Sequence, residues 1–151
     1  MFRGNAEAKV DEKGRLKLPS RFLSVLPESF GRRFYVTSLI GDCVWIYPME
    51  SWRAVERKLA DAPSSTPSIP LTFIRKFRRN VNFFGQESEM DAAERILLPA
   101  LLRERAATTG DVFVVGFDDH LEVWNRQRFE SKMQAETFDD TDLENLAHFN
   151  L

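Results

Sequence analysis

The alternation of apolar and polar positions along the chain predicts two similar β-hairpins, each followed by a helix. Four short segments rich in Val, Ile and aromatic residues form two pairs: 34–37 with 43–47, and 112–115 with 121–124. Such segments, bounded by Gly or Asp, are typical of β-strands. Turn residues lie at 41–42 and 118–119, and polar helical stretches follow at 49–60 and 126–135. The order strand, strand, helix therefore occurs twice.

A short motif precedes each hairpin and repeats after 80 residues. Segment 11–19 reads DEKGRLKLP, and segment 91–99 reads DAAERILLP. Both contain Asp, three residues, Arg, an apolar residue, any residue, Leu and Pro. The period exceeds the roughly 20–50 residues of solenoid repeats. We infer two fused copies of one module, related by a pseudo-two-fold axis as in a homodimer, a form that often reads duplex DNA.

The first motif has the alternation of an extended segment. Leu16 and Leu18 fall on one face, and Arg15 and Lys17 fall on the other. Pro19 has no backbone N–H, so it ends the strand and begins a turn or a short helix through 20–22.

The tip of this hairpin is predicted to be cationic. Gly14 suits a tight turn with positive φ, and Asp11 can pair across that turn with Arg15. With Lys13, Lys17 and Arg21, these residues form a compact surface suited to phosphates and, through Arg, to guanine edges. Alternatively, the Asp–Arg pair only holds the turn together. The motif alone leaves both interpretations open.

The second motif predicts a weaker binding surface. Lys13, Lys17 and Arg21 are replaced by Ala93, Leu97 and Leu101. Arg95 remains the only cation of the set, and Glu94 replaces a glycine, which adds negative charge and removes conformational freedom. We expect the first copy to contact nucleic acid and the second to be more structural.

Charge is distributed unevenly along the chain, although the net charge is only −2. Residues 1–110 contain 18 Lys and Arg against 13 Asp and Glu, a net of +5, and residues 111–151 contain 3 against 10, a net of −7. Local patches rather than totals determine binding to polyanions. A single Cys and the lack of a membrane-length apolar run or leader sequence favour a cytoplasmic protein.

Residues 63–70, rich in Pro and Ser, are expected to form a linker. An amphipathic cationic helix is expected next, with apolar residues at helical spacing and cations between them: Phe73, Ile74, Phe77, Val81 and Phe84, with Arg75, Lys76, Arg78 and Arg79. A solvated or subunit-contacting face is favoured over phosphate binding. The surplus aromatic residues near the linker, including Phe83, predict a homo-oligomer larger than a dimer.

Other chemistry-bearing residues indicate no enzyme. Cys43 is expected to be buried, and His120 and His148 lack the spacing of a metal site. The segment 118–120 is better explained as a hairpin turn than as an acid–base cluster. The acidic end of the chain is either a disordered tail or a terminal helical anchor.

The chain resembles the MraZ family, within the wider AbrB-like group of swapped-hairpin DNA-binding proteins. The resemblance rests on the start MFRG, both Asp-x-x-x-Arg motifs with their following Pro, and the segment WIYP at 45–48. It implies a mixed β fold with helices, a double-split β-barrel built from two tandem βββα-type repeats. Expected boundaries are 1–61 for the first repeat, 62–84 for the linker and amphipathic helix, 85–135 for the second repeat, and 136–151 for the acidic tail.

The resemblance also implies a transcriptional regulator of the division and cell-wall gene cluster. Such a regulator is a ring-shaped homo-oligomer, cytoplasmic and nucleoid-associated, that binds repeated short elements in double-stranded DNA upstream of its own operon. The expected DNA-binding residues combine both motifs with neighbouring cations: Arg15, Lys13, Lys17, Asp11, Arg21, Arg95, Asp91 and Arg3.

No cofactor, metal, membrane or small-molecule substrate is expected. A structural or adaptor ring that mainly binds other proteins is the alternative function. A hydrolase using the Asp/His cluster is a third and weaker one.

Overall fold

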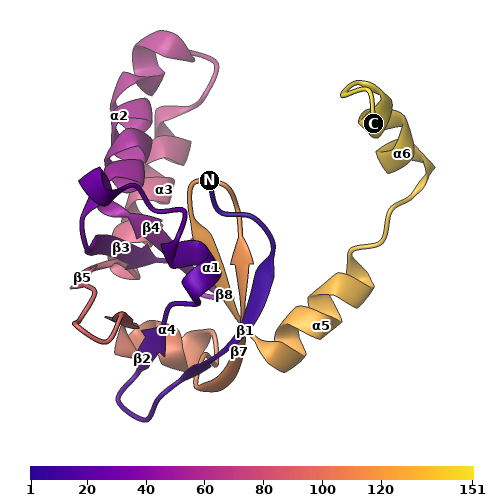
Figure 1. The fold of residues 1–151 in the computed structure, drawn as a ribbon. Helices are drawn as coiled ribbons and strands as arrows, with labels where there is room; N and C mark the ends of the chain where they lie inside the picture. The colour runs from indigo at the N-terminus through magenta and orange to yellow at the C-terminus, as the bar shows by residue number, and fades with distance from the viewer.

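The computed structural model describes residues 1–151, and eight strands form one antiparallel sheet that curls into a nearly closed barrel (Figure 1). The order along the sheet is β5-β3-β4-β8-β7-β1-β2-β6. The elements, in chain order, are β1 (Asn5–Val10), β2 (Arg15–Lys17), α1 (Ser20–Leu23), the 3-10 helix η1 (Glu28–Phe30), β3 (Arg33–Thr37), β4 (Val44–Pro48), α2 (Met49–Ser65), α3 (Leu71–Phe83), β5 (Gln86–Glu89), β6 (Arg95–Leu97), α4 (Ala100–Arg105), β7 (Gly110–Gly116), β8 (Leu121–Asn125), α5 (Arg126–Ala135) and α6 (Asp140–Ala147).

The two sequence copies exchange their first strands. β1 of the first copy pairs with β7 of the second, and β5 of the second copy pairs with β3 of the first. The remaining cross-copy pairs are β2 with β6, centred on Leu16 opposite Ile96, and β4 with β8, centred on Trp45 opposite Glu122. Exchanging the copies leaves both pairs in register, so the pseudo-two-fold axis passes through these two positions. The expected double-split barrel is confirmed.

One hydrophobic core serves both copies. Nineteen buried residues form a continuous cluster, and Leu16 and Ile96 are fully buried at its centre. Their neighbours Arg15, Lys17, Arg95 and Leu97 alternate to the outside, as the strand period requires. Full burial of a large apolar side chain contributes about 1.5–3 kcal/mol. Either motif therefore needs the other copy to bury its leucine or isoleucine.

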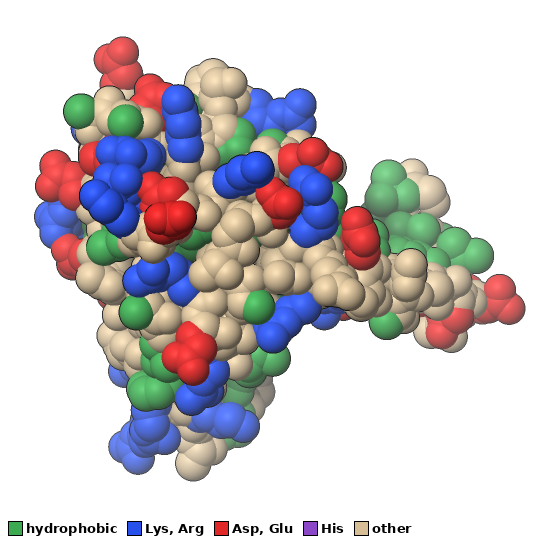
Figure 2. Space-filling view, turned by 90° about the horizontal axis from the view of Figure 1, so that it is seen from below, with side chains coloured by type: hydrophobic (Ala, Val, Ile, Leu, Met, Phe, Trp, Pro, Cys, Tyr) green, Lys and Arg blue, Asp and Glu red, His purple; other side chains and the backbone are tan.

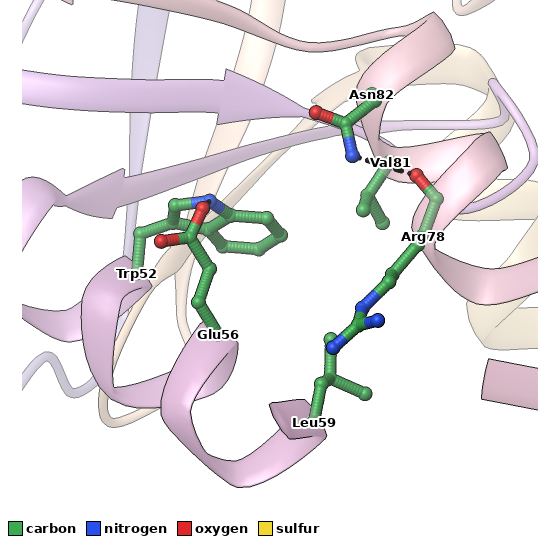
Figure 3. A pocket seen from close by; sticks show the side chains of 6 residues that line it. All are labelled: Trp52, Glu56, Leu59, Arg78, Val81 and Asn82. Atoms are coloured by element: carbon green, nitrogen blue, oxygen red, sulfur yellow. Dashed lines mark hydrogen bonds between the residues drawn. The ribbon is translucent and has the colours of Figure 1, made fainter. Parts of the chain in front are cut away.

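The helices α2 and α3 form a pair packed against one side of the sheet, around a smaller core (Figure 1). Tyr35 stacks on Trp52 with ring centroids 4.5 Å apart, and its hydroxyl donates to the Val81 carbonyl oxygen at 3.1 Å. A hollow of about 250 Å³ lies between the helices, and there the Trp52 indole nitrogen donates to Glu56 at 2.9 Å (Figure 3). On the opposite wall Arg78 extends toward Leu59. These contacts fix α3 to the sheet.

Two features differ from expectation. α2 continues through Pro63 to Ser65, past the expected end at residue 60, because a proline in the last turn removes only one hydrogen bond. The strands β1 and β5 were not expected: β1 alternates only through the small side chains of Ala6 and Ala8 before Val10, and β5 has no apolar residue. Of the two alternatives for the acidic end, the structure has the helix, α6, whose start is closed by a capping box between Asp139 and Asp142. No helix is long and apolar enough to span a membrane.

Candidate nucleic-acid interface

In the first motif, a single carboxylate organises both the turn and the arginine. Asp11 Oδ1 accepts hydrogen bonds from the backbone N–H groups of Lys13 and Arg15, each at 2.9 Å. Its Oδ2 accepts from Arg15 Nε at 2.8 Å. We call this set of hydrogen bonds from one carboxylate to the turn and to the arginine a brace. Because the brace uses Nε, the two terminal nitrogens of the guanidinium remain available for a ligand. The expected Asp–Arg pairing across the turn is confirmed.

The second motif has the same geometry. Asp91 Oδ1 accepts from the N–H groups of Ala93 and Arg95 at 2.9 Å, and Oδ2 accepts from Arg95 Nε at 2.9 Å. The turn residue Gly14 has φ of 82°, and its counterpart Glu94 has φ of 62°. The loss of glycine therefore does not change this turn, since the carboxylate brace and the neighbouring strands hold Glu94 in the left-handed region.

The electrostatics of the two braces also match. The pKa of Asp11 lies below its ordinary value, chiefly because of the hydrogen bond from the Arg15 N–H, with the Arg15 side chain adding to it. The pKa of Asp91 is lowered by the same groups of Arg95. Hydrogen bonds and a positive charge favour the ionised carboxylate. Both carboxylates therefore stay charged and keep their arginines oriented at neutral pH.

The pairing of β2 with β6 brings both motifs onto one surface. Arg15 lies opposite Leu97, and Lys17 lies opposite Arg95. We call the outward side of these two strands the ribbon face, formed by Arg15, Lys17, Arg95 and Leu97. The arginine side chains are similarly accessible, at 29% for Arg15 and 33% for Arg95. The two motifs are therefore parts of one composite surface rather than two separate sites.

Two further arginines lie beside the turns, and sequence reasoning missed both. A Cβ on Gly14 would come within 2.4 Å of the Arg103 guanidinium, so Arg103 of α4 covers the first turn. Arg32 donates from Nε to the Met90 carbonyl oxygen at 3.3 Å and also contacts the Asp91 carbonyl oxygen, beside the second turn. Each of these arginines belongs to the opposite sequence copy from the turn that it contacts, so no spacing within a motif indicates it.

Of the remaining expected DNA-binding residues, Lys13 lies near the ribbon face, whereas Arg21 and Arg3 lie away from it. Lys13 is exposed at the tip of the first turn and lines a shallow hollow with Asp11 and Arg15. Arg21 instead contacts the Asn5 carbonyl oxygen at the start of β1. Arg3 lies at that same end, against Gly116. The six residues of β1, about 20 Å of strand, lie between this end and Asp11. Arg3 and Arg21 are therefore not brought together with the ribbon face.

Acidic groups moderate the charge of this end of the molecule. Glu94 shares a groove with Lys9 and Lys17, so its carboxylate offsets part of their positive charge. Figure 2 views the molecule from this end and shows Lys and Arg side chains with Asp and Glu among them. The cations of α3 lie elsewhere, because α3 packs at the end of the barrel away from β2 (Figure 1).

Cys43 and His120 are packed inside the protein, away from the ribbon face. Cys43 is buried, and burial raises the pKa of its thiol above the ordinary range. His120 stacks on Tyr47 with ring centroids 4.4 Å apart, and its Nδ1 lies 2.7 Å from Asp119. Residues 117–120 form a turn closed by a hydrogen bond from the Phe117 N–H to the His120 carbonyl oxygen at 2.9 Å. The expected burial of Cys43 and the expected turn are confirmed.

Comparisons with known proteins agree with the geometry. The family described as "MraZ protein, putative antitoxin-like" matches residues 1–71 and 84–147. A protein of Acidobacterium capsulatum named "Transcriptional regulator MraZ" is 45% identical over 151 residues, covering all of both chains. Proteins of the same name from Koribacter versatilis and Chromobacterium violaceum are 39% and 35% identical, again over the full length of both chains.

Proposed function

The chain belongs to the MraZ family, and on that premise we propose that it is a transcriptional regulator that binds double-stranded DNA through the ribbon face. One observation carries the proposal: two carboxylate-braced arginines stand on the same side of a two-stranded antiparallel ribbon. A braced guanidinium presents two parallel donors in a fixed direction. Guanine offers two acceptors at matching spacing on its major-groove edge.

The two-stranded form of the ribbon supports major-groove binding. The major groove is about 12 Å wide and admits a two-stranded β-ribbon. Lys13 at the tip, Lys17 on the strand and Arg103 beside Gly14 are placed to contact phosphates on either side of the groove. Phosphate contacts would supply affinity and register, while Arg15 and Arg95 would supply base selection.

We further propose, from the family resemblance, that the target is the promoter of the protein's own operon in the division and cell-wall gene cluster. Several short repeated elements there would be bound by a ring-shaped homo-oligomer, in the cytoplasm and on the nucleoid. Repeats in the DNA and copies in the ring would act together. Each further contact then becomes intramolecular, which multiplies weak individual affinities.

The proposal is tested by measuring the affinity of an Arg15→Ala variant for DNA. A lost bidentate base contact costs about 1–3 kcal/mol at each site, so the variant should lose about 5-fold to 150-fold in affinity for a single element and more for the repeated promoter. Fluorescence anisotropy with the upstream promoter and a scrambled duplex measures this loss. Arg57→Ala, at an exposed position of α2, is the matched control. Unchanged affinity in a folded Arg15→Ala protein would refute the assignment.

The same experiment compares the two copies. Arg95→Ala is expected to weaken binding less than Arg15→Ala, because Glu94 and Ala93 make its surroundings less positive than those of Arg15. An equal loss would mean that the two arginines contribute equally and that the ranking of the two motifs is wrong.

A structural or adaptor ring that binds proteins is the second candidate. The exposed aromatic side chains Phe73 and Phe83 of α3, at 53% and 60%, favour a protein contact there. Assembly of the wild-type protein without any preference for its promoter would support this alternative.

A further inference from the structure

The C-terminal arm, residues 136–151, carries an apolar surface that its own chain leaves uncovered. Phe138, Leu143, Phe149 and Leu151 are exposed at 71%, 55%, 75% and 84%. Figure 1 shows α6 projecting away from the barrel, and Figure 2 shows hydrophobic side chains gathered on this projection. Glu136 at its start still bonds to Lys132 of α5, whereas the hydrogen bonds of α6, including the capping box, stay within the arm. Contiguous exposed apolar surface of this kind marks an interaction site.

The charge of the arm narrows the choice of partner. It contains five acidic residues and no Lys or Arg: Glu136, Asp139, Asp140, Asp142 and Glu144. An acidic, apolar helix requires a surface that is apolar at its centre and positive at its edge, because a neutral or acidic rim would leave these charges repelled or unpaired. Such an arm is not suited to DNA.

A groove of that kind lies between α3 and the loop that joins β3 to β4. Its apolar lining comes from Leu39, Ile40, Phe73 and Phe77, and its polar lining from Lys76 and Asn80. The groove has a volume of about 220 Å³, and Ile40 is 66% exposed. Lys76 lines the groove and α3 has no acidic residue, so the edge of the groove on this helix is positive.

The arm cannot fill its own groove as the molecule is built. α3 and α6 lie on opposite sides of the barrel (Figure 1). We propose that residues 136–151 of one copy dock in the α3 groove of a second copy, with the acidic residues of the arm facing the cations of α3. Two different surfaces meet in this head-to-tail contact, which forms a ring when the rotation between copies closes. This inference rests on the assembly stated under the proposed function and identifies its contact.

Charge reversal in the full-length protein tests the contact. One variant carries Lys76→Glu in the groove with Arg79→Glu on the same helix. The other carries Asp140→Lys with Glu144→Lys in the arm. Asp139 and Asp142 are retained so that the capping box survives. Each variant alone has an arm and a groove of the same sign. In native mass spectrometry at micromolar concentration, each should fall from the wild-type assembly to monomers or dimers.

Mixing the two variants provides the decisive measurement. In an equimolar mixture every arm meets a groove of opposite sign, so the mass of the wild-type assembly should return. Arg57→Glu with Lys58→Glu, on the exposed side of α2, controls for the change in net charge and should keep that mass. Circular dichroism checks that each variant retains its helices.

Outcomes for assembly and for DNA binding separate the two proposals. The inference is overturned if either variant keeps the wild-type mass, or if the mixture fails to restore it. Both variants should bind a single promoter element as wild type does, since the ribbon face is unchanged, whereas Arg15→Ala should assemble normally. A wild-type protein that is monomeric at micromolar concentration would refute the docking and the ring together, without bearing on single-element DNA binding.

Discussion

At the scale of single residues, Glu94 has a conformation that its neighbours impose. A non-glycine residue in the left-handed region costs about 1–2 kcal/mol of folding free energy. A change to glycine removes this cost, but part of the gain is lost because glycine has more conformational freedom in the unfolded chain. Glu94→Gly is therefore expected to raise the free energy of unfolding by about 0.5–1 kcal/mol, since the exposed side chain donates no contact that stabilises the turn.

Urea unfolding of Glu94→Gly beside Glu94→Ala measures this effect. The alanine variant removes the charge but keeps the strained conformation, so it should gain little. A stabilisation that is equal in the two variants would attribute the effect to charge instead.

The carboxylates of the two braces should make stability depend on acid pH. The folded-state pKa values of Asp11 and Asp91 are lowered, so each contributes stability that is present above its unfolded value near 3.8 and is lost as pH falls through the folded value. Melting temperature should therefore decline more steeply below about pH 4 in the wild type than in an Asp11→Asn, Asp91→Asn variant. Asp118, whose pKa is lowered by the N-terminal ammonium group, is present in both proteins and cancels in the comparison.

At the scale of elements, the ribbon face has one apolar gap. Leu97 stands opposite Arg15, where the first copy has Lys17 in the equivalent position, and it is 43% exposed. Leu97→Lys should tighten DNA binding and steepen the salt dependence, because each added phosphate contact raises the slope by about 0.9. A salt titration with Leu97→Gln as the neutral control measures the slope. A slope equal to that of the wild type would place Leu97 outside the interface.

The elements also show how far the sequence predicts the fold. Hairpin strands rich in Val and aromatic residues, both motifs, the turn at Gly14 and the amphipathic α3 were predictable, since local pattern and burial agree there. β5 was not, because its sequence QESE has no apolar residue and its strand form depends on pairing with β3, at least 50 residues away. The positions of Arg32 and Arg103 beside the turns could not be predicted either, because only tertiary contacts bring these residues there.

At the scale of the whole molecule, the ribbon face is symmetric in backbone and asymmetric in side chains. A symmetric dimer selects palindromic sites, whereas a face with Arg15 and Lys17 on one strand and Arg95 and Leu97 on the other has a direction. The promoter elements should therefore be read in one orientation. Inverting a single repeat should lower promoter affinity about as much as deleting it, which anisotropy with synthetic duplexes can measure. A harmless inversion would contradict directional reading.

The covalent fusion of the two copies also has an evolutionary consequence. In a homodimer one gene encodes both halves, so every substitution appears twice, and a change that improves one half of a contact is imposed on the other. In this chain each half is inherited separately. Lys17 in the first copy corresponds to Leu97 in the second, and Gly14 in the first turn corresponds to Glu94 in the second. Two copies within one gene can therefore differ in charge and in turn residue while they share one barrel.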